Sequence, residues 1–363
     1  MSTPALLLIL LTCASSYADS QSRPGPAPLG SAVRYASTFP GQDVGDQINR
    51  AYADLPGSGG MIVTEGGSFA SPIVFATKDK PVLLIGIPGD VVTLTYSGAS
   101  GVAITFDYGT SHRMGHGLRD LTLTGPGNST ATTGVIFGGN NGAEGIAFRD
   151  FKIQSFGTNI QLASHTWLAF FEHGMIRDGG HNAVLPSGLT EAGEQIVFNH
   201  VTFADAPPPH TDSVWVQGGG QEVIFTDCSF DQAQLRIGNG TISAAQVVVR
   251  GAHFENPNYA SPGASNYDYV VTDNNPGNYL RMTESYLLQS APSGGPSRFM
   301  YLAGGHVYLM AIGMYTQKDS PMANVAMLAN GVSVNMTAFE DLSGNISGTM
   351  WGGSTTGKVL PAP

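Results

Sequence analysis

Apolar residues recur along the chain in one short pattern. A large apolar residue is followed by a turn-forming residue at offset two and by further apolar residues at offsets three and five. Successive copies are 30, 22, 28, 27, 24, 33, 28 and 24 residues apart, and they begin at Leu118, Phe148, Phe170, Phe198, Phe225, Val249, Met282, Met310 and Val334. A repeat of this length predicts a solenoid, in which each repeat forms one coil.

The spacing inside each copy predicts two short strands that meet at a corner, because offsets zero, three and five fit neither a helical stripe nor one uninterrupted strand. Asp and Asn tolerate the left-handed backbone angles of such a corner. The expected corner residues are Asp120, Asp150, Glu172, His200, Asp227 and Glu284. The pattern is imperfect in three copies, where offset three falls on His173, Gly313 and Thr337.

A third apolar segment follows a loop of variable length in most repeats. These segments begin at Asn159, Ala183, Ser213, Gln234, Tyr269, Phe299 and Val325. Three strands per repeat predict an all-β protein, a parallel β-helix of about ten coils. The composition agrees, since the chain has 48 Gly and only 12% charged residues.

One helix is expected, over residues 43–55. Ile48, Ala51, Tyr52 and Leu55 would share one face of it. A helix at this place would cap the open end of the stack and cover its strand edges.

The chain resembles a known superfamily at this entry segment. A short helix containing Ile48 is followed by LPGSGG at Leu55, by MIVTEGG at Met61, and then by the repeats. This order is similar to the pectate lyase-like superfamily of single-stranded right-handed β-helices, which includes pectate lyases, family 28 glycoside hydrolases and many phage depolymerases. The resemblance covers about residues 35–347 and implies a right-handed β-helix, but it does not specify one reaction.

The two ends of the chain indicate the compartment in which the protein would work. Residues 1–18 are expected to be a secretory signal peptide, with an apolar run too short to span a bilayer. An N-terminal anchor stays open, because this segment has no Lys or Arg. We expect a flexible Pro- and Gly-rich lead-in at 19–34, the β-helix at 35–347, and a tail at 348–363. The predicted location is extracellular or periplasmic.

Candidate catalytic residues lie in the loops before the third strand. Asp178, Asp212 and Asp231 precede that strand in three successive repeats, so neighbours would be about 5 to 10 Å apart. Hydrolysis of a glycosidic bond needs two such carboxylates. The resemblance to family 28 implies the same location, although the NTD, DD and GHG motifs of that family are missing. The corner acids are explained by turn chemistry alone.

Further residues could bind substrate. Outward positions of the third strand are predicted for Gln161, Trp215, Gln234 and Arg236. Trp215 could stack on a sugar and Arg236 could bind a carboxylate. The alternative is a Trp215 covered by its neighbouring loop and an Arg236 paired with Asp212 or Asp231. The remaining candidates for substrate binding are His181, His210 and Glu255.

Three functions remain open from the sequence. A glycoside hydrolase using an Asp pair is preferred. A polysaccharide lyase would need Arg236 and a calcium ion held by Asp212, Asp231 or Glu255. The third is a non-catalytic glycan-binding or structural β-helix. Apart from that calcium, no cofactor or metal is expected, because the nine His are scattered and one Cys remains after signal cleavage.

The net charge limits the classes of partner that the protein is expected to bind. The net charge of −11 and pI of about 5.1 argue against nucleic acid and anionic membranes. They favour a neutral or weakly acidic glycan as the substrate. No membrane span is expected in the mature chain, and its oligomeric state stays open. Cys228 occupies an inward offset-three position, so we expect it to be a small core residue.

Overall fold

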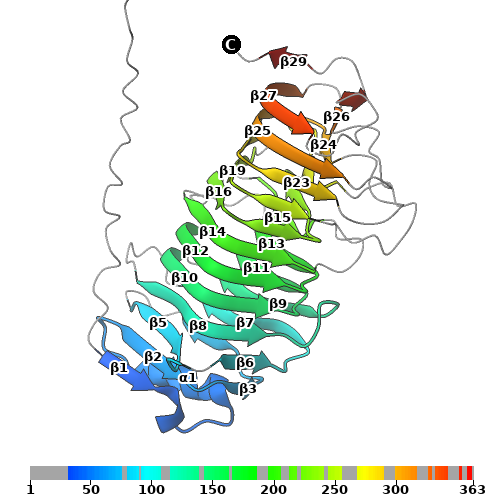
Figure 1. Ribbon diagram of the computed structural model, residues 1–363. Coiled ribbons are helices and arrows are strands. Elements are labelled where there is room, and N and C mark those ends of the chain that lie inside the picture. Colours follow the sequence, from blue (N-terminus) through cyan, green and yellow to red (C-terminus); the bar gives the residue numbers. More distant parts are fainter. Residues whose placement is uncertain are drawn as a thin grey trace, which may run out of the picture.

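The computed structural model is a parallel β-solenoid with one α-helix near the N-terminus (Figure 1). In the part of the chain that the structure describes, nearly all regular secondary structure is β-strand, so the predicted all-β class is confirmed. The structure describes residues 32–75, 80–89, 91–107, 115–138, 143–162, 166–185, 195–205, 212–218, 222–240, 244–255, 268–289, 299–316, 326–328, 332–341, 351–353 and 358–361.

Within these residues the strands form two sheets, of 18 and 11 strands, and every pairing is parallel. The N-terminal elements of the larger sheet, with the helices, are β1 (Ala32–Tyr35), η1 (Ala36–Thr38), α1 (Val44–Asp54), β2 (Gly60–Thr64), β3 (Gly67–Phe69), β5 (Val82–Gly86) and β6 (Val92–Tyr96). Its later strands are β8 (His116–Thr124), β10 (Ala143–Gln154), β12 (Thr166–Arg177), β14 (Ile196–Ala204), β16 (Glu222–Thr226), β17 (Ser229–Asp231), β19 (Gln246–Arg250), β20 (His253–Glu255), β22 (Tyr279–Thr283), β23 (Tyr286–Gln289), β25 (His306–Thr316), β27 (Ser333–Asp341) and β29 (Lys358–Pro361).

The smaller sheet contains the third strand of each repeat. Its members are β4 (Ile73–Phe75), β7 (Ser100–Phe106), β9 (Ala131–Phe137), β11 (Thr158–Leu162), β13 (His181–Leu185), β15 (Val214–Val216), β18 (Leu235–Ile237), β21 (Val270–Thr272), β24 (Met300–Leu302), β26 (Ala326–Leu328) and β28 (Trp351–Gly353). We call this sheet face C. The larger sheet bends at the corner residues into face A before the corner, such as 196–199, and face B after it, such as 201–204.

The predicted corner is confirmed in most repeats. Asp120, Asp150, His200, Asp227 and Glu284 all have φ between 50° and 54°. These left-handed angles turn the chain from face A to face B while each coil stays directly above the one before it.

The predicted corner was wrong where the repeat was imperfect. The left-handed residues are His173 instead of Glu172, and Ala311 one residue after the predicted start of its repeat. Pairing with β25 places a third corner near residue 338, two positions later than the pattern indicated. Phe170 and Phe171 are both apolar, so the sequence could not tell which one enters the core. The structure buries Phe171 and turns Phe170 outward.

Apolar side chains stack from coil to coil inside the solenoid. The rings of Phe171 and Phe198 lie 4.5 Å apart between centroids, and those of Phe230 and Phe254 lie 4.4 Å apart at 3°. Cys228 is buried in this core as predicted, and burial raises the pKa of its thiol to about 12. Gly174 leaves room for the Phe151 ring, which a Cβ at residue 174 would overlap.

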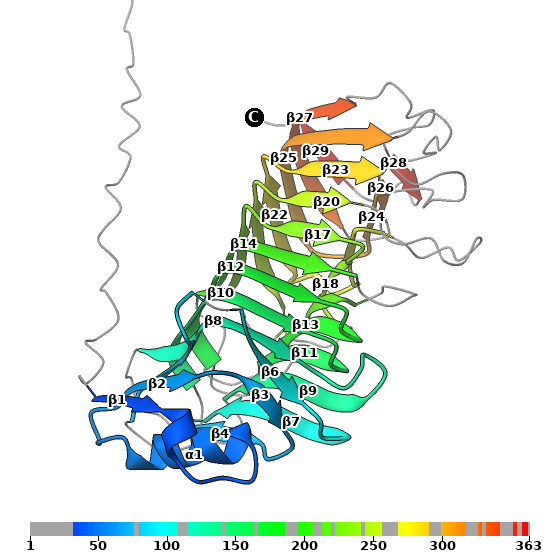
Figure 2. The same cartoon turned by 60° about the horizontal axis from the view of Figure 1, so that its bottom comes forward.

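The N-terminal helix closes one end of the stack. α1 packs against β2, β3 and β4, with Ile48, Ala51 and Tyr52 buried as predicted (Figure 2). Asp43 is its N-cap, and its carboxylate accepts hydrogen bonds from the backbone N–H groups of Asp46, Ala70 and Ser71. One side chain therefore holds both the helix and the turn beside it.

The ends of the solenoid differ from the predicted boundaries. β1 begins at Ala32, inside the predicted lead-in, and pairs with β2. β28 and β29 lie in the predicted tail and extend the two sheets. The predicted signal peptide lies outside the described residues. Among the described residues, no helix is long and apolar enough to cross a membrane.

Replacing Gly174 tests the packing of the corner. Gly174→Ala should lower the free energy of unfolding by about 1–3 kcal/mol, because the new methyl group overlaps the Phe151 ring. Gly57→Ala is the matched control, since a Cβ at residue 57 meets open space. Urea unfolding would measure both. Equal effects of the two substitutions would contradict the packing at Gly174.

Replacing Asp43 tests the attachment of the helix. Partial burial raises the pKa of the Asp43 carboxyl, but hydrogen bonds from three backbone N–H groups lower it more, so its pKa lies below the usual value. Asp43 therefore stabilises the fold fully above the unfolded-state pKa, and this contribution is lost as the pH falls through the folded-state pKa. Asp43→Ala should cost about 1 kcal/mol at pH 7.

The difference in melting temperature between Asp43→Ala and the natural protein should shrink as the pH falls from 7 to about 2. Glu65→Gln, which changes an exposed carboxylate that accepts one bond from Ser37, is the control. A difference that is the same at every pH would contradict the role given to the Asp43 carboxylate.

Candidate functional site

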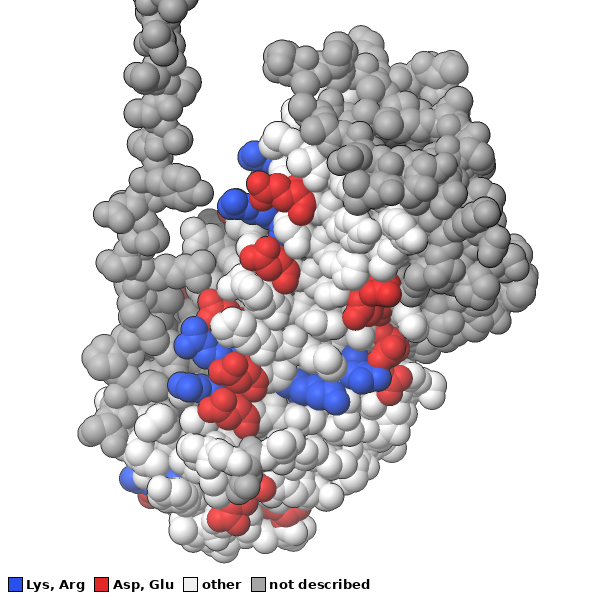
Figure 3. Space-filling model, in the orientation of Figure 1, with Lys and Arg blue, Asp and Glu red and all other residues white. Residues whose placement is uncertain are grey.

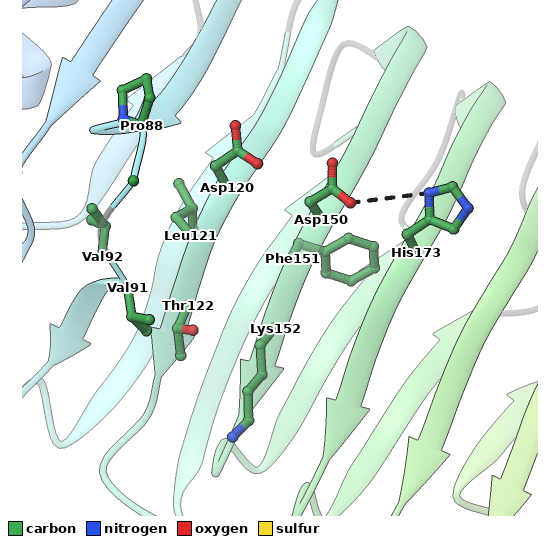
Figure 4. A pocket seen from close by; sticks show the side chains of 11 residues that line it. Pro88, Val91, Val92, Asp120, Leu121, Thr122, Asp150, Phe151, Lys152 and His173 are labelled. Atoms are coloured by element: carbon green, nitrogen blue, oxygen red, sulfur yellow. Dashed lines mark ion pairs between the residues drawn. The ribbon is translucent and has the colours of Figure 1, made fainter.

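Two hollows are found on the outer surface of the described solenoid. The first, of about 500 Å³, lies beside the corner between faces A and B and is lined in part by Asp120, Asp150 and His173 (Figure 4). In Figure 4 the Asp150 carboxylate and the His173 ring point toward each other, and they are 4.0 Å apart. All three are left-handed corner residues, so the backbone turn accounts for Asp120 and Asp150 without any activity.

The second hollow, of about 340 Å³, lies on face B over β12, β14, β17 and β20. We call it the acidic groove. Its lining residues are Met175, Arg177, Thr202, Ala204, Asp205, Asp231, Gln232 and Glu255. Figure 3 shows acidic and basic side chains gathered near the middle of the solenoid on this side of the molecule. Turn chemistry does not account for Asp231 and Glu255, since both lie within strands, whereas Asp205 has a left-handed backbone.

The parallel register brings the acids of the groove together. Asp231 on β17 is aligned with Glu255 on β20, in the next coil. One carboxylate oxygen of each lies within 4.8 Å of the other. Asp205 follows β14 and forms an ion pair with Arg177. The Ser229 hydroxyl donates a hydrogen bond of 2.8 Å to Asp231 Oδ1. Three carboxylates from three successive coils thus surround one half-buried space.

Four of the predicted site residues form a second cluster, on face C. The guanidinium of Arg236 lies 4.9 Å from the ring centroid of Trp215 and donates a 2.7 Å hydrogen bond to Asp212 Oδ1. His181, from the coil on the other side, lies 6.3 Å from the Trp215 ring. The indole N–H donates to the backbone oxygen of Gly238.

The side chains of this cluster contact one another. Trp215 is half-buried, and Arg236 and His181, from the two neighbouring coils, lie beside its ring. Arg236 is already paired with Asp212. For Arg236 the geometry follows the structural alternative that the sequence left open, whereas most of the loop that was expected to cover Trp215 lies outside the described residues.

The Asp178 carboxylate is also held by hydrogen bonds within the fold. Its two carboxylate oxygens accept hydrogen bonds from the Asn128 amide at 2.8 Å and the Ser155 hydroxyl at 2.7 Å. Asp178 and Asp205 are both left-handed residues at the turn from face B to face C. Asp178, Asp212 and Asp231 therefore do not line up across successive coils as expected, because each aspartate occupies a different position in its coil.

Gln234 corrects a further prediction. It was expected to point outward, but it is 4% exposed. Its amide accepts a hydrogen bond from Asp212 N and donates one to the Asp268 backbone oxygen. Gln234 extends a buried polar ladder in which Asn159 Nδ2 donates to Asn182 Oδ1 and Asn182 Nδ2 donates to Ser213 Oγ.

Of the predicted site residues, Asp231 and Glu255 lie in the acidic groove, and His210 lies outside the described residues. Arg177, Asp205 and His253 are not among the predicted site residues. Counting from the corrected repeat at Phe171, Arg177 falls at offset six, as do Asp231 and Glu255 in their own repeats. For Arg177 that shared offset was the available signal, and the misplaced start of its repeat hid it.

Comparisons with known proteins support the fold. No family model matches the chain, and no curated protein sequence matches it. Among solved structures, the chain is similar to the enzymatically active domain of tailspike protein 4 of bacteriophage CBA120, with a TM-score of 0.63 and 16% identity over 89% of this chain and 45% of that chain. The chain thus spans less than half of that tailspike structure.

Two further structures are similar. The catalytic domain of a GH87 alpha-1,3-glucanase in complex with nigerose gives a TM-score of 0.51 and 12% identity, over 93% of this chain and 68% of that chain. The Agl-KA catalytic domain gives 0.55 and 10%, over 93% and 70%. Identities this low show a shared fold alone. The comparisons therefore support the parallel β-solenoid fold that the sequence predicted.

Replacing Asn182 tests the polar ladder. This side chain is fully buried and forms four hydrogen bonds, to Asn159, Gly179, Ala204 and Ser213. Asn182→Ala should cost at least about 2 kcal/mol, because buried partners lose their hydrogen bonds. Gln161→Ala, on the outward side of the same sheet, should change stability by less than about 0.5 kcal/mol. Chemical denaturation would compare them, and similar costs would refute the ladder.

Proposed function

We propose that this protein is a polysaccharide-degrading glycoside hydrolase with its active site in the acidic groove. The observation that carries the proposal is the pairing of Asp231 and Glu255, whose oxygens lie within 4.8 Å of each other beside a hollow on the outer surface. Glycosidases need two carboxyl groups flanking the scissile bond. A rigid sheet holds this pair in position, as catalysis requires.

The oxygen–oxygen distance between Asp231 and Glu255, which is at most 4.8 Å, favours a retaining mechanism. Carboxyl groups about 5–5.5 Å apart suit a double displacement, whereas inverting enzymes leave about 6.5–9.5 Å for a water molecule. In this mechanism one carboxylic acid protonates the leaving oxygen while the other carboxylate attacks the anomeric carbon. Water then hydrolyses the glycosyl-enzyme with the first residue acting as base. The ion pair with Arg177 orients Asp205 at the end of the groove.

The similar structures support a glycan substrate. A tailspike domain described as enzymatically active and the catalytic domain of an alpha-1,3-glucanase share this fold with the chain. The net charge of −11 and the three acids in the groove favour a neutral glycan over a polyuronate.

Amide substitutions in the groove test the proposal. Asp231→Asn and Glu255→Gln should each lower kcat/KM by at least about 10²-fold on the polysaccharide that the natural protein cleaves, because each removes one member of the acid pair. A panel of neutral and weakly acidic polysaccharides would first identify that substrate by the release of reducing ends. Product anomers followed by NMR should show retention.

Asp178→Asn and Asp212→Asn are matched controls. Their carboxylates hold structural bonds outside the groove, so kcat/KM should change by less than a few-fold while stability falls. Loss of activity in these controls, with activity kept in Asp231→Asn, would overturn the site. Unsaturated uronic products detected by ultraviolet absorbance would indicate a lyase. Binding to a glycan column without any product would indicate a binding protein.

A further inference from the structure

A histidine stands beside the acid pair of the groove. His253 and Glu255 are two residues apart on β20, so both side chains leave the strand on its outer side. Asp231 on β17 is aligned with Glu255, and Ser229 is aligned with His253. One ligand atom from each of Asp231, His253 and Glu255 lies within 4.8 Å of the other two. All three residues are half-buried.

These distances fit a single ion. Transition metals are bound by His nitrogen and carboxylate oxygen at about 2.0–2.2 Å, which places two ligand atoms of one ion about 3–4 Å apart. The three side chains would close to that spacing through small rotations, without movement of the strands. An imidazole with two carboxylates favours zinc-like transition metals over calcium or magnesium, which prefer oxygen ligands only.

The surroundings of the three residues fit ligation. The Ser229 hydroxyl donates a hydrogen bond to Asp231 Oδ1. Such outer hydrogen bonds orient metal ligands. The Tyr286 ring lies 5.7 Å from the His253 ring and limits how it turns. Two carboxylates and one imidazole also give a net negative charge to the place that a cation would occupy.

We propose that Asp231, His253 and Glu255 bind one divalent transition-metal ion of the zinc class, with further positions open to water or to a sugar hydroxyl. Ion binding does not depend on the proposed hydrolysis and is measured without a glycan. Carboxylates that ligate an ion are withdrawn from acid and base chemistry, so the metal-free form would be the hydrolytic one if both proposals hold.

Titration calorimetry with Zn²⁺ tests this inference on protein purified without a histidine tag and treated with chelator. We expect one ion per chain, and we expect Co²⁺ at the same site to give visible absorption bands. His253→Gln should weaken Zn²⁺ binding by at least about tenfold, because it removes one ligand of three. Ser229→Ala should weaken it by about tenfold through the lost orientation of Asp231.

His306→Gln is the matched control, since His306 is an exposed histidine two coils away on face A. It should leave Zn²⁺ binding unchanged. Circular dichroism would verify that each variant is folded. Absence of Zn²⁺ binding at millimolar concentration would overturn the inference. So would equal affinity of His253→Gln and the natural protein, or binding of Ca²⁺ in preference to Zn²⁺.

Discussion

The structure depends on one backbone constraint, the left-handed residue that turns each coil from face A to face B. Asp120, Asp150, His173, His200 and Asp227 adopt nearly the same φ in five successive coils. Because the turn uses one residue each time, the positions that follow it on face B lie directly above their counterparts. Strands in a sheet are about 4.8 Å apart, so side chains at matching positions form continuous ladders.

These ladders have different roles inside the solenoid and on its outer surface. Inside, rings such as Phe230 and Phe254 stack face to face, and the amides of Asn159 and Asn182 satisfy each other where the chain turns toward face C. Outside, the same spacing sets Asp231 beside Glu255. Core stability and the candidate site therefore follow from one geometric rule. A change that shifted one corner would disturb packing and site together.

The fold could be predicted from the sequence because a solenoid repeats its signal. The period, the corner and the helix at Val44–Asp54 each follow from local residue types that recur or are strongly amphipathic. The register, which decides which residues of a repeat point into the core, was harder to predict. Where two apolar residues are adjacent, as at Phe170 and Phe171, the pattern cannot choose between them, and only packing against Phe198 decides. The buried amide of Gln234 was missed because its partners come from neighbouring coils.

The candidate site was predicted only in part for the same reason. Asp231 and Glu255 were named, but they were assigned to different roles, because they were taken as loop residues and their shared offset of six was not used. Trp215 and Arg236 lie at half-buried middle positions of β15 and β18. The sequence could not choose between an open and a paired arrangement for them, because their contacts with each other, with His181 and with Asp212 cross between coils.

The ring stacking of Phe203, Phe230 and Phe254 has a consequence for how such a chain can change in evolution. Each of these coils presents a Phe ring at the same position of face B. A whole coil could be duplicated or deleted and the new neighbours would still fit, whereas gaining or losing a few residues within a strand would not. The solenoid can therefore become longer or shorter only by whole coils, while its loops can vary by single residues.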